Sequence, residues 1–168
     1  DYFPNARGVF RTGVGTDNID SAELDDRKIT LGLPSTKTRD IIYDETAAFS
    51  THLILSALFR TSWNFATWRR ESRAHIRERK VLLVGCGNIG SRVRKNLENA
   101  VEIIISDPVV EGSVNLEEAI ETADVISLHI PPIEENVGVV NESFLAKMKD
   151  GASIVNTARG ALVDEFAL

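Results

Sequence analysis

The chain has 168 residues, the length of one ordinary domain, and its 43% hydrophobic content is enough to build a sizeable core. A formal net charge of −6 argues against nucleic acid as the main partner, because phosphate backbones bind to basic surfaces. The single cysteine excludes an internal disulfide framework and fits a cytoplasmic location, and no apolar run approaches the roughly 20 residues that a membrane span needs.

The first 40 residues predict two short strands and one short helix. The apolar residues 8–10 and 29–33 are the strand candidates, and Asp20 or Ser21 is a suitable N-cap for a helix through Leu24. The acidic residues near this turn lack the glycine and glutamate spacing of a calcium loop, so we predict no metal site.

Residues 41–60 predict a long helix that follows a polar loop at residues 35–39. Spacings of three and four residues join the members of its stripe, which are Ile42, Thr46, Phe49, Leu53 and Ala57. Residues 63–79 then combine basic side chains with two tryptophans. Interleaved glutamates favour a solvated helical arm here over a nucleic-acid-binding segment.

The sequence G-x-G-x-x-G at residues 85–90 is the central feature of the second half. It follows an apolar run at residues 81–84 that predicts a buried strand, and a helical pattern opens directly after it. Gly85 permits a sharp turn, Gly87 lets the backbone approach a pyrophosphate, and Gly90 lets the helix pack close to its strand. The helix N-terminus then attracts the phosphates of a dinucleotide.

Asp107 stands where a dinucleotide site needs an acidic residue. It ends a second predicted buried strand, residues 101–106, and lies seventeen positions after Gly90. The expected spacing is about 20 residues. A carboxylate there accepts both ribose hydroxyls of an adenosine and repels a 2′-phosphate, which favours NAD over NADP. The alternative is that Asp107 and Pro108 form only a strand-ending turn.

The remaining residues continue the alternation of strands and helices. Strands are predicted at residues 125–130 and 153–158, and the predicted helices are residues 115–120, residues 141–149 and a segment that starts near Asp164. This order predicts an α/β fold, with a doubly wound parallel sheet of the Rossmann type.

Arg159 follows the last predicted strand by one residue, at the sheet edge where such folds bind ligands. Its guanidinium can hold a substrate carboxylate in a bidentate pair and polarise a neighbouring carbonyl for hydride attack. The alternative is a helix-capping or surface cation.

Together these segments resemble the D-isomer-specific 2-hydroxyacid dehydrogenases, the group that includes D-3-phosphoglycerate, glycerate, D-lactate and formate dehydrogenases. The motifs that carry the resemblance are residues 11–20 (RTGVGTDNID), 85–90 (GCGNIG), 127–131 (SLHIP), 148–152 (MKDGA) and 155–165 (VNTARGALVDE). The similarity extends over nearly the whole chain and is weakest across residues 35–79.

The resemblance implies three segments. Residues 1–40 are the C-terminal remnant of the first segment of a substrate domain, residues 41–79 are an interdomain helix and arm, and residues 80–168 are a truncated NAD-binding Rossmann domain. We therefore expect the chain to be a fragment of a longer protein.

The resemblance also implies the roles of individual residues. The cofactor-binding residues are Gly85, Gly87, Asn88, Ile89, Gly90, Asp107, Ile130, Pro131, Thr157, Ala158 and Arg159. The substrate-binding residues are Val14, Gly15 and Arg159, of which Arg159 is the catalytic one. His129 matches a family position near the cofactor and is not the catalytic histidine.

The implied function is an NAD-dependent oxidoreductase that moves hydride between nicotinamide and a small D-2-hydroxy acid or 2-keto acid, such as phosphoglycerate or glycerate. The family's catalytic glutamate and histidine lie beyond Leu168, so we expect this chain alone to be inactive. A homodimer is implied as well. The alternatives are an NAD(H)-sensing regulatory protein on the same scaffold and a pseudoenzyme that keeps the cofactor for assembly.

Overall fold

The computed structural model describes residues 5–59 and 74–168, which fall into two compact units divided between Glu45 and Thr46. Most of the predicted basic arm, including both tryptophans, lies in residues 60–73, outside the described residues. The prediction of a solvated helical arm therefore stays a prediction.

The first unit contains the predicted short strands and helix. Strand β1 (Gly8–Phe10) pairs in parallel with β2 (Thr30–Gly32), and helix α1 (Ser21–Asp26) lies between them in sequence. The side chain of Asp20 accepts a hydrogen bond from the backbone N–H of Glu23 at 3.0 Å. Asp20 is thus the N-cap, as predicted, and satisfies one of the backbone donors that a helix start leaves open.

Helix α2 (Thr36–Phe59) starts earlier than predicted. The prediction of a loop at residues 35–39 is wrong, because Ser35 caps this helix. Its Oγ accepts a hydrogen bond from the backbone N–H of Thr38 at 3.2 Å. Serine is a preferred N-cap residue, but the polarity of this segment favoured a loop over a helix start.

The buried face of α2 is also displaced from the predicted stripe. Its buried residues are Ala47, Ser50, Ile54 and Leu58, each one position after a predicted residue. Phe49, a member of the predicted stripe, is 57% exposed. One residue turns an α-helix by about 100°, so the helix presents a different side to the sheet. The small residues Ala47 and Ser50 allow a close approach that Phe49 would prevent.

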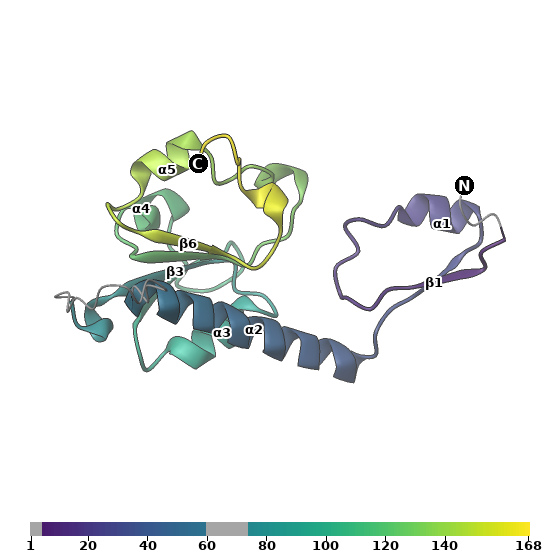
Figure 1. Cartoon of the computed structure of the whole chain (residues 1–168), viewed down its shortest axis with the longest axis horizontal. Coiled ribbons are helices and arrows are strands. Elements are labelled where there is room, and N and C mark those ends of the chain that lie inside the picture. Colours follow the sequence, from purple (N-terminus) through teal and green to yellow (C-terminus); the bar gives the residue numbers. More distant parts are fainter. Residues whose placement is uncertain (1–4, 60–73) are drawn as a thin grey trace, which may run out of the picture. The chain divides into compact units, whose positions relative to one another are not determined.

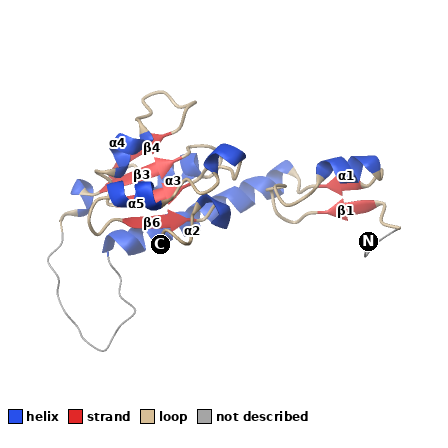
Figure 2. Ribbon diagram, turned by 90° about the horizontal axis from the view of Figure 1, so that it is seen from above, coloured by secondary structure: helices blue, strands red, loops and turns tan. Residues whose placement is uncertain are grey.

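Four parallel strands form the sheet of the second unit, in the order β4-β3-β5-β6 (Figure 2). These strands are β3 (Lys80–Val84), β4 (Glu102–Ser106), β5 (Val125–Leu128) and β6 (Ser153–Asn156). The central strands β3 and β5 are buried, in agreement with their continuous apolar sequences. Strand β4, predicted to be buried, lies at the edge of the four strands and is half-buried.

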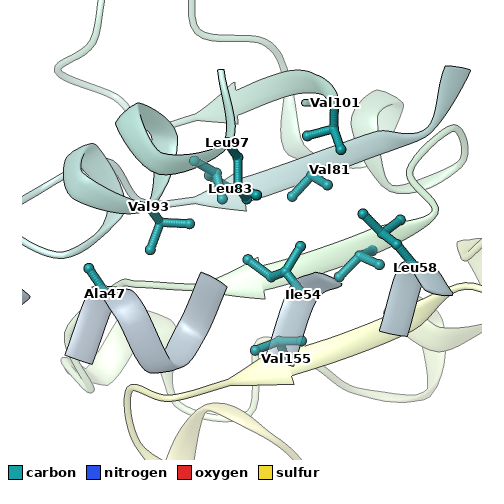
Figure 3. Close-up of a cluster of buried hydrophobic side chains, with 10 residues drawn as sticks. Ala47, Ile54, Leu58, Val81, Leu83, Val93, Leu97, Val101 and Val155 are labelled. Carbon is teal, nitrogen blue, oxygen red and sulfur yellow. The ribbon is translucent and has the colours of Figure 1, made fainter. Parts of the chain in front are cut away.

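Helices cover both faces of the sheet (Figure 1). The second part of α2 and helix α3 (Gly90–Leu97) pack on one face, and α4 (Leu116–Ile120) and α5 (Glu142–Lys147) pack on the other. The core of the first face (Figure 3) consists of Ala47, Ile54, Leu58, Val81, Leu83, Val93, Leu97, Val101, Val125 and Val155. The core of the second face includes Leu82 and Val84, the alternate residues of β3. This arrangement confirms the predicted doubly wound fold.

Three short 3₁₀-helices complete the described elements: η1 (Ile76–Glu78), η2 (Glu134–Asn136) and η3 (Gly160–Leu162). The predicted helix near Asp164 is absent from the described residues. The chain there makes an isolated bridge between Val163 and Val140, and the backbone N–H of Asp164 donates to the carbonyl of Val140 at 2.9 Å. Pairing with this segment takes the place of the helix that the sequence predicted.

Asp124 joins the amino ends of three strands. Its Oδ1 accepts hydrogen bonds from Arg79 at 2.8 Å and Lys149 at 2.7 Å, and its Oδ2 accepts the backbone N–H of Lys80 at 2.9 Å. Burial alone would raise the pKa of this carboxyl, but the hydrogen bonds from Lys149, Lys80 and Arg79 together lower it. Asp124 is therefore a charged anchor at the edge opposite the predicted site.

Candidate cofactor-binding site

The register of the sheet aligns the carboxyl ends of all four strands. Val84 of β3 pairs with Ser106 of β4 and Leu128 of β5, and Leu128 pairs with Asn156 of β6. The residues that directly follow these ends are Gly85, Asp107, His129 and Thr157. Each lies in a segment that the sequence predicts for cofactor binding, and the structure brings all four segments to one edge of the sheet.

Gly85 and Gly90 are needed for close backbone packing. Gly85 has a φ of +91°, and a Cβ there would lie 2.7 Å from the carbonyl oxygen of His129. A Cβ on Gly90 would overlap the carbonyl oxygen of Gly85. By contrast, a Cβ on Gly87 would meet nothing within 4 Å. Two glycines thus close the turn, and the third leaves open space above it, which fits the requirement of a pyrophosphate.

Helix α3 begins where this turn ends, at Gly90. Its N-cap residue, Ile89, makes no side-chain capping hydrogen bond within the described structure. The exposed residues Gly87 and Asn88 precede it. A helix start without a capping side chain keeps its positive end of the dipole available to an anion. The loop and helix therefore have the features of a phosphate-binding site.

Asp107 is tied to the glycine turn. Its Oδ2 accepts the backbone N–H of Cys86 at 2.7 Å, and its Oδ1 accepts that of Val109 at 3.0 Å. Its own N–H donates to the Oγ of Ser113 at 2.8 Å. A carboxylate oxygen can accept two hydrogen bonds, so both oxygens retain capacity for ribose hydroxyls. Sequence reasoning missed Ser113, because no motif marks a serine six residues after the acidic position.

His129 is held as a neutral imidazole beneath the turn. Burial lowers the pKa of His129 to about 4. Its Nε2 lies 2.9 Å from the Oγ of Ser127, and its buried Nδ1 has no hydrogen-bond partner in the described parts of the chain. A neutral ring adds no positive charge next to the glycine turn, which agrees with a role in shaping the turn.

Ile130 and Pro131 continue from His129 along the same edge. A Cβ on Gly85 would lie 2.8 Å from the Cγ2 of Ile130, so this side chain packs against the turn. Pro131 is exposed, and its carbonyl accepts a hydrogen bond from the side chain of Asn136 at 2.9 Å. Ile130 therefore provides an apolar border to the turn.

The segment after β6 is braced by the side chain of Asn156. The Oδ1 of Asn156 accepts the backbone N–H of Ala158 at 3.0 Å, and its Nδ2 donates to the carbonyl of Arg159 at 2.8 Å. Arg159 is half-buried, and its Nη1 donates to the carbonyl of Ala158 at 2.9 Å. Sequence reasoning missed the brace, although an asparagine at a strand end is a known turn-forming residue.

A second brace comes from helix α2. The hydroxyls of Ser50 and Thr157 lie 2.7 Å apart, and Ser50 also donates to the carbonyl of Thr46 at 2.8 Å. The two hydroxyls are 107 positions apart in sequence, so nothing in the sequence marks this contact.

Val14 and Gly15 belong to the first unit, in the loop between β1 and α1. Both are half-buried within that unit. Their predicted contact with the substrate carboxylate or the nicotinamide remains a prediction.

Cys86 lies inside the glycine turn and is half-buried. Burial raises the pKa of its thiol, as does Asp107, and Arg94 opposes the shift. The residue is therefore a neutral thiol at neutral pH. In the part of the chain that the structure describes, no group of three or more His, Cys, Asp or Glu side chains could hold a metal ion. No helix in residues 5–59 or 74–168 has both the length and the apolar character needed to cross a membrane.

Comparison with known proteins agrees with this geometry. Residues 51–168 match the family described as "D-isomer specific 2-hydroxyacid dehydrogenase, NAD binding domain". The chain is 31% identical to a hydroxypyruvate reductase of Thermotoga maritima, covering 98% of this chain and 57% of that protein. It is also 31% identical to a D-3-phosphoglycerate dehydrogenase of Mycobacterium bovis, covering 98% of this chain and 34% of that protein.

A solved structure gives the same result. The NAD⁺-bound 3-phosphoglycerate dehydrogenase of Entamoeba histolytica superposes with a TM-score of 0.79 at 25% identity, over 98% of this chain and 52% of that one. The chain thus spans between about a third and somewhat more than half of the relatives it matches. It belongs to the D-isomer specific 2-hydroxyacid dehydrogenase family, whose NAD-binding domain its residues 51–168 match.

Proposed function

We propose that this chain provides the cofactor-binding part of an NAD-dependent dehydrogenase that acts on a small D-2-hydroxy acid or 2-keto acid. The observation that carries the proposal is the common edge of the sheet. The glycine turn, Asp107 and Arg159 come after the ends of β3, β4 and β6, and the register aligns these ends. A dinucleotide site needs the first two features, and a substrate with a carboxylate needs the third.

In this proposal the residues of the common edge hold NAD along its length. The backbone of Asn88 and Ile89 binds the pyrophosphate at the start of α3, and Asp107 accepts the hydroxyls of the adenosine ribose. Ile130 and Pro131 border the adenine, and the segment from Thr157 to Arg159 lies beside the nicotinamide. When bound, NAD accepts or gives the hydride.

Arg159 binds the substrate carboxylate and polarises the neighbouring carbonyl, because its guanidinium forms two parallel hydrogen bonds to an anionic acceptor. From the family resemblance we also propose that Val14 and Gly15 make backbone contacts to the substrate carboxylate or the nicotinamide. The family resemblance supports this assignment, as do the names of the relatives, a hydroxypyruvate reductase and a D-3-phosphoglycerate dehydrogenase.

Proton transfer to the substrate oxygen requires an acid-base group, and we assign that role to none of the 168 residues. His129 is neutral and lies beneath the glycine turn, bonded to Ser127. The chain alone should therefore bind the cofactor without catalysing turnover of hydroxypyruvate, glyoxylate or 3-phosphoglycerate. Turnover by the purified 168-residue chain would contradict this assignment.

Calorimetric titration of the chain with NADH and NADPH tests the cofactor site. We expect binding of NADH and a much weaker binding of NADPH, because Asp107 repels the 2′-phosphate. Replacement Asp107→Ala should reduce NADH affinity and remove the preference. Equal affinity of the unchanged chain for both cofactors would overturn the role of Asp107, and absence of binding to either would overturn the proposed function.

We also propose a homodimer in the cytoplasm. Helix α2 carries two large apolar side chains that are more than half exposed, Ile41 at 54% and Phe49 at 57%, and the single cysteine fits a reducing compartment. Light scattering should give twice the mass of the chain, and Phe49→Asp should shift the mass toward one copy. A monomeric mass at all concentrations would contradict the dimer.

A further inference from the structure

Ser50 is fully buried, and it is the one polar residue among the buried residues described for α2. Two hydrogen bonds satisfy its Oγ. One is donated to the carbonyl of Thr46 at 2.8 Å, within the helix, and the other joins it to the Oγ1 of Thr157 at 2.7 Å. The second bond connects the helix to the segment that carries Arg159.

The number of protons fixes the direction of this second bond. A serine hydroxyl has one proton to donate, and Ser50 donates its proton to Thr46. The proton between the two hydroxyls must then come from Thr157. With its own proton committed to Ser50, the Oγ1 of Thr157 has only lone pairs left for any other partner. Thr157 therefore acts toward a ligand as a hydrogen-bond acceptor.

We propose that Ser50 is a positioning residue that makes the hydroxyl of Thr157 an obligate acceptor for the amide NH₂ of the nicotinamide carboxamide. The inference rests on the proposed function, which sets Thr157 beside the nicotinamide. An acceptor at this place selects a carboxamide ring, which donates hydrogen bonds, over a nicotinate ring, whose carboxylate only accepts them. Ser50 thus determines specificity for the amidated cofactor without touching it.

Thr51 provides an internal comparison on the same helix. Its Oγ1 donates to the carbonyl of Ala47 at 2.7 Å, the same bond within the helix that Ser50 makes. Its second hydrogen bond joins it to the side chain of Asn96 on α3 at 3.1 Å and not to the segment after β6. Replacement Thr51→Ala therefore reproduces the loss of a hydroxyl from α2 without changing Thr157.

The test compares the affinity of the 168-residue chain for NADH with its affinity for ADP-ribose, which lacks the nicotinamide ring. Replacement Ser50→Ala should weaken NADH binding by about two- to ten-fold, the effect of one hydrogen bond. Affinity for ADP-ribose should stay unchanged. Thr157→Val should give the same pattern, and the double variant should be no weaker than either single one, because both remove the same interaction. Thr51→Ala should change the affinity for neither NADH nor ADP-ribose.

A second measurement uses reduced nicotinic acid adenine dinucleotide, whose ring carries a carboxylate. The unchanged chain should bind it more weakly than NADH, and Ser50→Ala should narrow this difference, because the released Thr157 hydroxyl can then donate. Equal weakening of NADH and ADP-ribose in Ser50→Ala would indicate a structural role only and overturn the inference. So would no change in NADH affinity. Failure of the unchanged chain to bind ADP-ribose or NADH would instead overturn the proposed function itself.

Discussion

Separate replacement of Gly87 and Gly90 by alanine distinguishes the predicted role of the turn in phosphate binding from its role in packing. A Cβ on Gly87 would enter open space with nothing within 4 Å, and its φ is not in the left-handed region, so Gly87→Ala should leave stability unchanged. If the pyrophosphate occupies that space, the methyl group displaces a charged hydrogen bond worth about 1.5–3 kcal/mol. NADH affinity should then fall by about ten- to a hundred-fold.

Gly90→Ala should instead lower the stability of the chain. The new Cβ would overlap the backbone carbonyl of Gly85, which cannot rotate away, so α3 must shift and its residues Val93 and Leu97 lose packing. The cost of overpacking is about 1–3 kcal/mol, and alanine returns up to about 1 kcal/mol of helix propensity. A net loss of about 1–2 kcal/mol lowers Tm by roughly 3–7 °C in a chain of this size.

Differential scanning fluorimetry gives the stability of both variants, and fluorescence titration gives their affinity for NADH. The expected pair is a stable Gly87→Ala chain that binds NADH poorly and a destabilised Gly90→Ala chain. If Gly87→Ala binds NADH as tightly as the unchanged chain, the open space is not the phosphate site. If Gly90→Ala has an unchanged Tm, the close approach of α3 to the turn is not essential.

Three further outcomes follow from the described contacts. Asp124→Ala removes the partner of Arg79 and Lys149 and should lower the free energy of unfolding by about 2–3 kcal/mol. This is less than the roughly 3–5 kcal/mol of a fully buried pair, because Lys149 is half exposed. Chemical denaturation measures the change, and Glu117→Ala, which removes the partner of Lys147 at an exposed position, is the control that should change little. His129 has a folded pKa of about 4 and an ordinary value near 6.5, so the unfolded chain binds the extra proton between these values. Stability should therefore fall by roughly 3 kcal/mol as the pH drops from 6.5 to 4, and His129→Gln should remove this loss in pH-dependent denaturation. Asn156→Asp keeps the acceptor for Ala158 and loses the donor to Arg159, so Tm should fall by a few degrees; an unchanged Tm would show that the brace contributes nothing.

Local patterns predicted the sheet and the glycine turn. The runs at β3 and β5 are apolar throughout because both faces of these strands are covered, and the residue types alone show this. The ends of β3 and β4 then follow, because glycine and aspartate stand directly after them. Strands β5 and β6 end at Leu128 and Asn156, two residues before the predicted ends, because no such residue stands directly after them. The common edge of Gly85, Asp107 and Thr157 needed only the additional rule that parallel strands align their carboxyl ends.

Contacts between distant segments were not predictable in this way. The face of α2 that packs on the sheet contains the small residues Ala47 and Ser50, and its choice depends on the sheet that it meets, which the local pattern does not contain. Apolarity alone pointed to Phe49, which is exposed. The predicted helix at Asp164 failed for a related reason, since the backbone there finds a partner at Val140, which the local sequence does not indicate.

The aligned register of the four strands also limits how this protein can change over evolutionary time. Deleting one residue within β6 would draw Thr157 and Arg159 back by one position and exchange the sides of the sheet that residues of the strand face. Loops at the amino ends carry no such constraint except at Asp124. Insertions and deletions in homologous genes should therefore occur mainly in the loops at the amino ends of the strands and in the connections to the helices. They should be rare within the strands whose register positions the site.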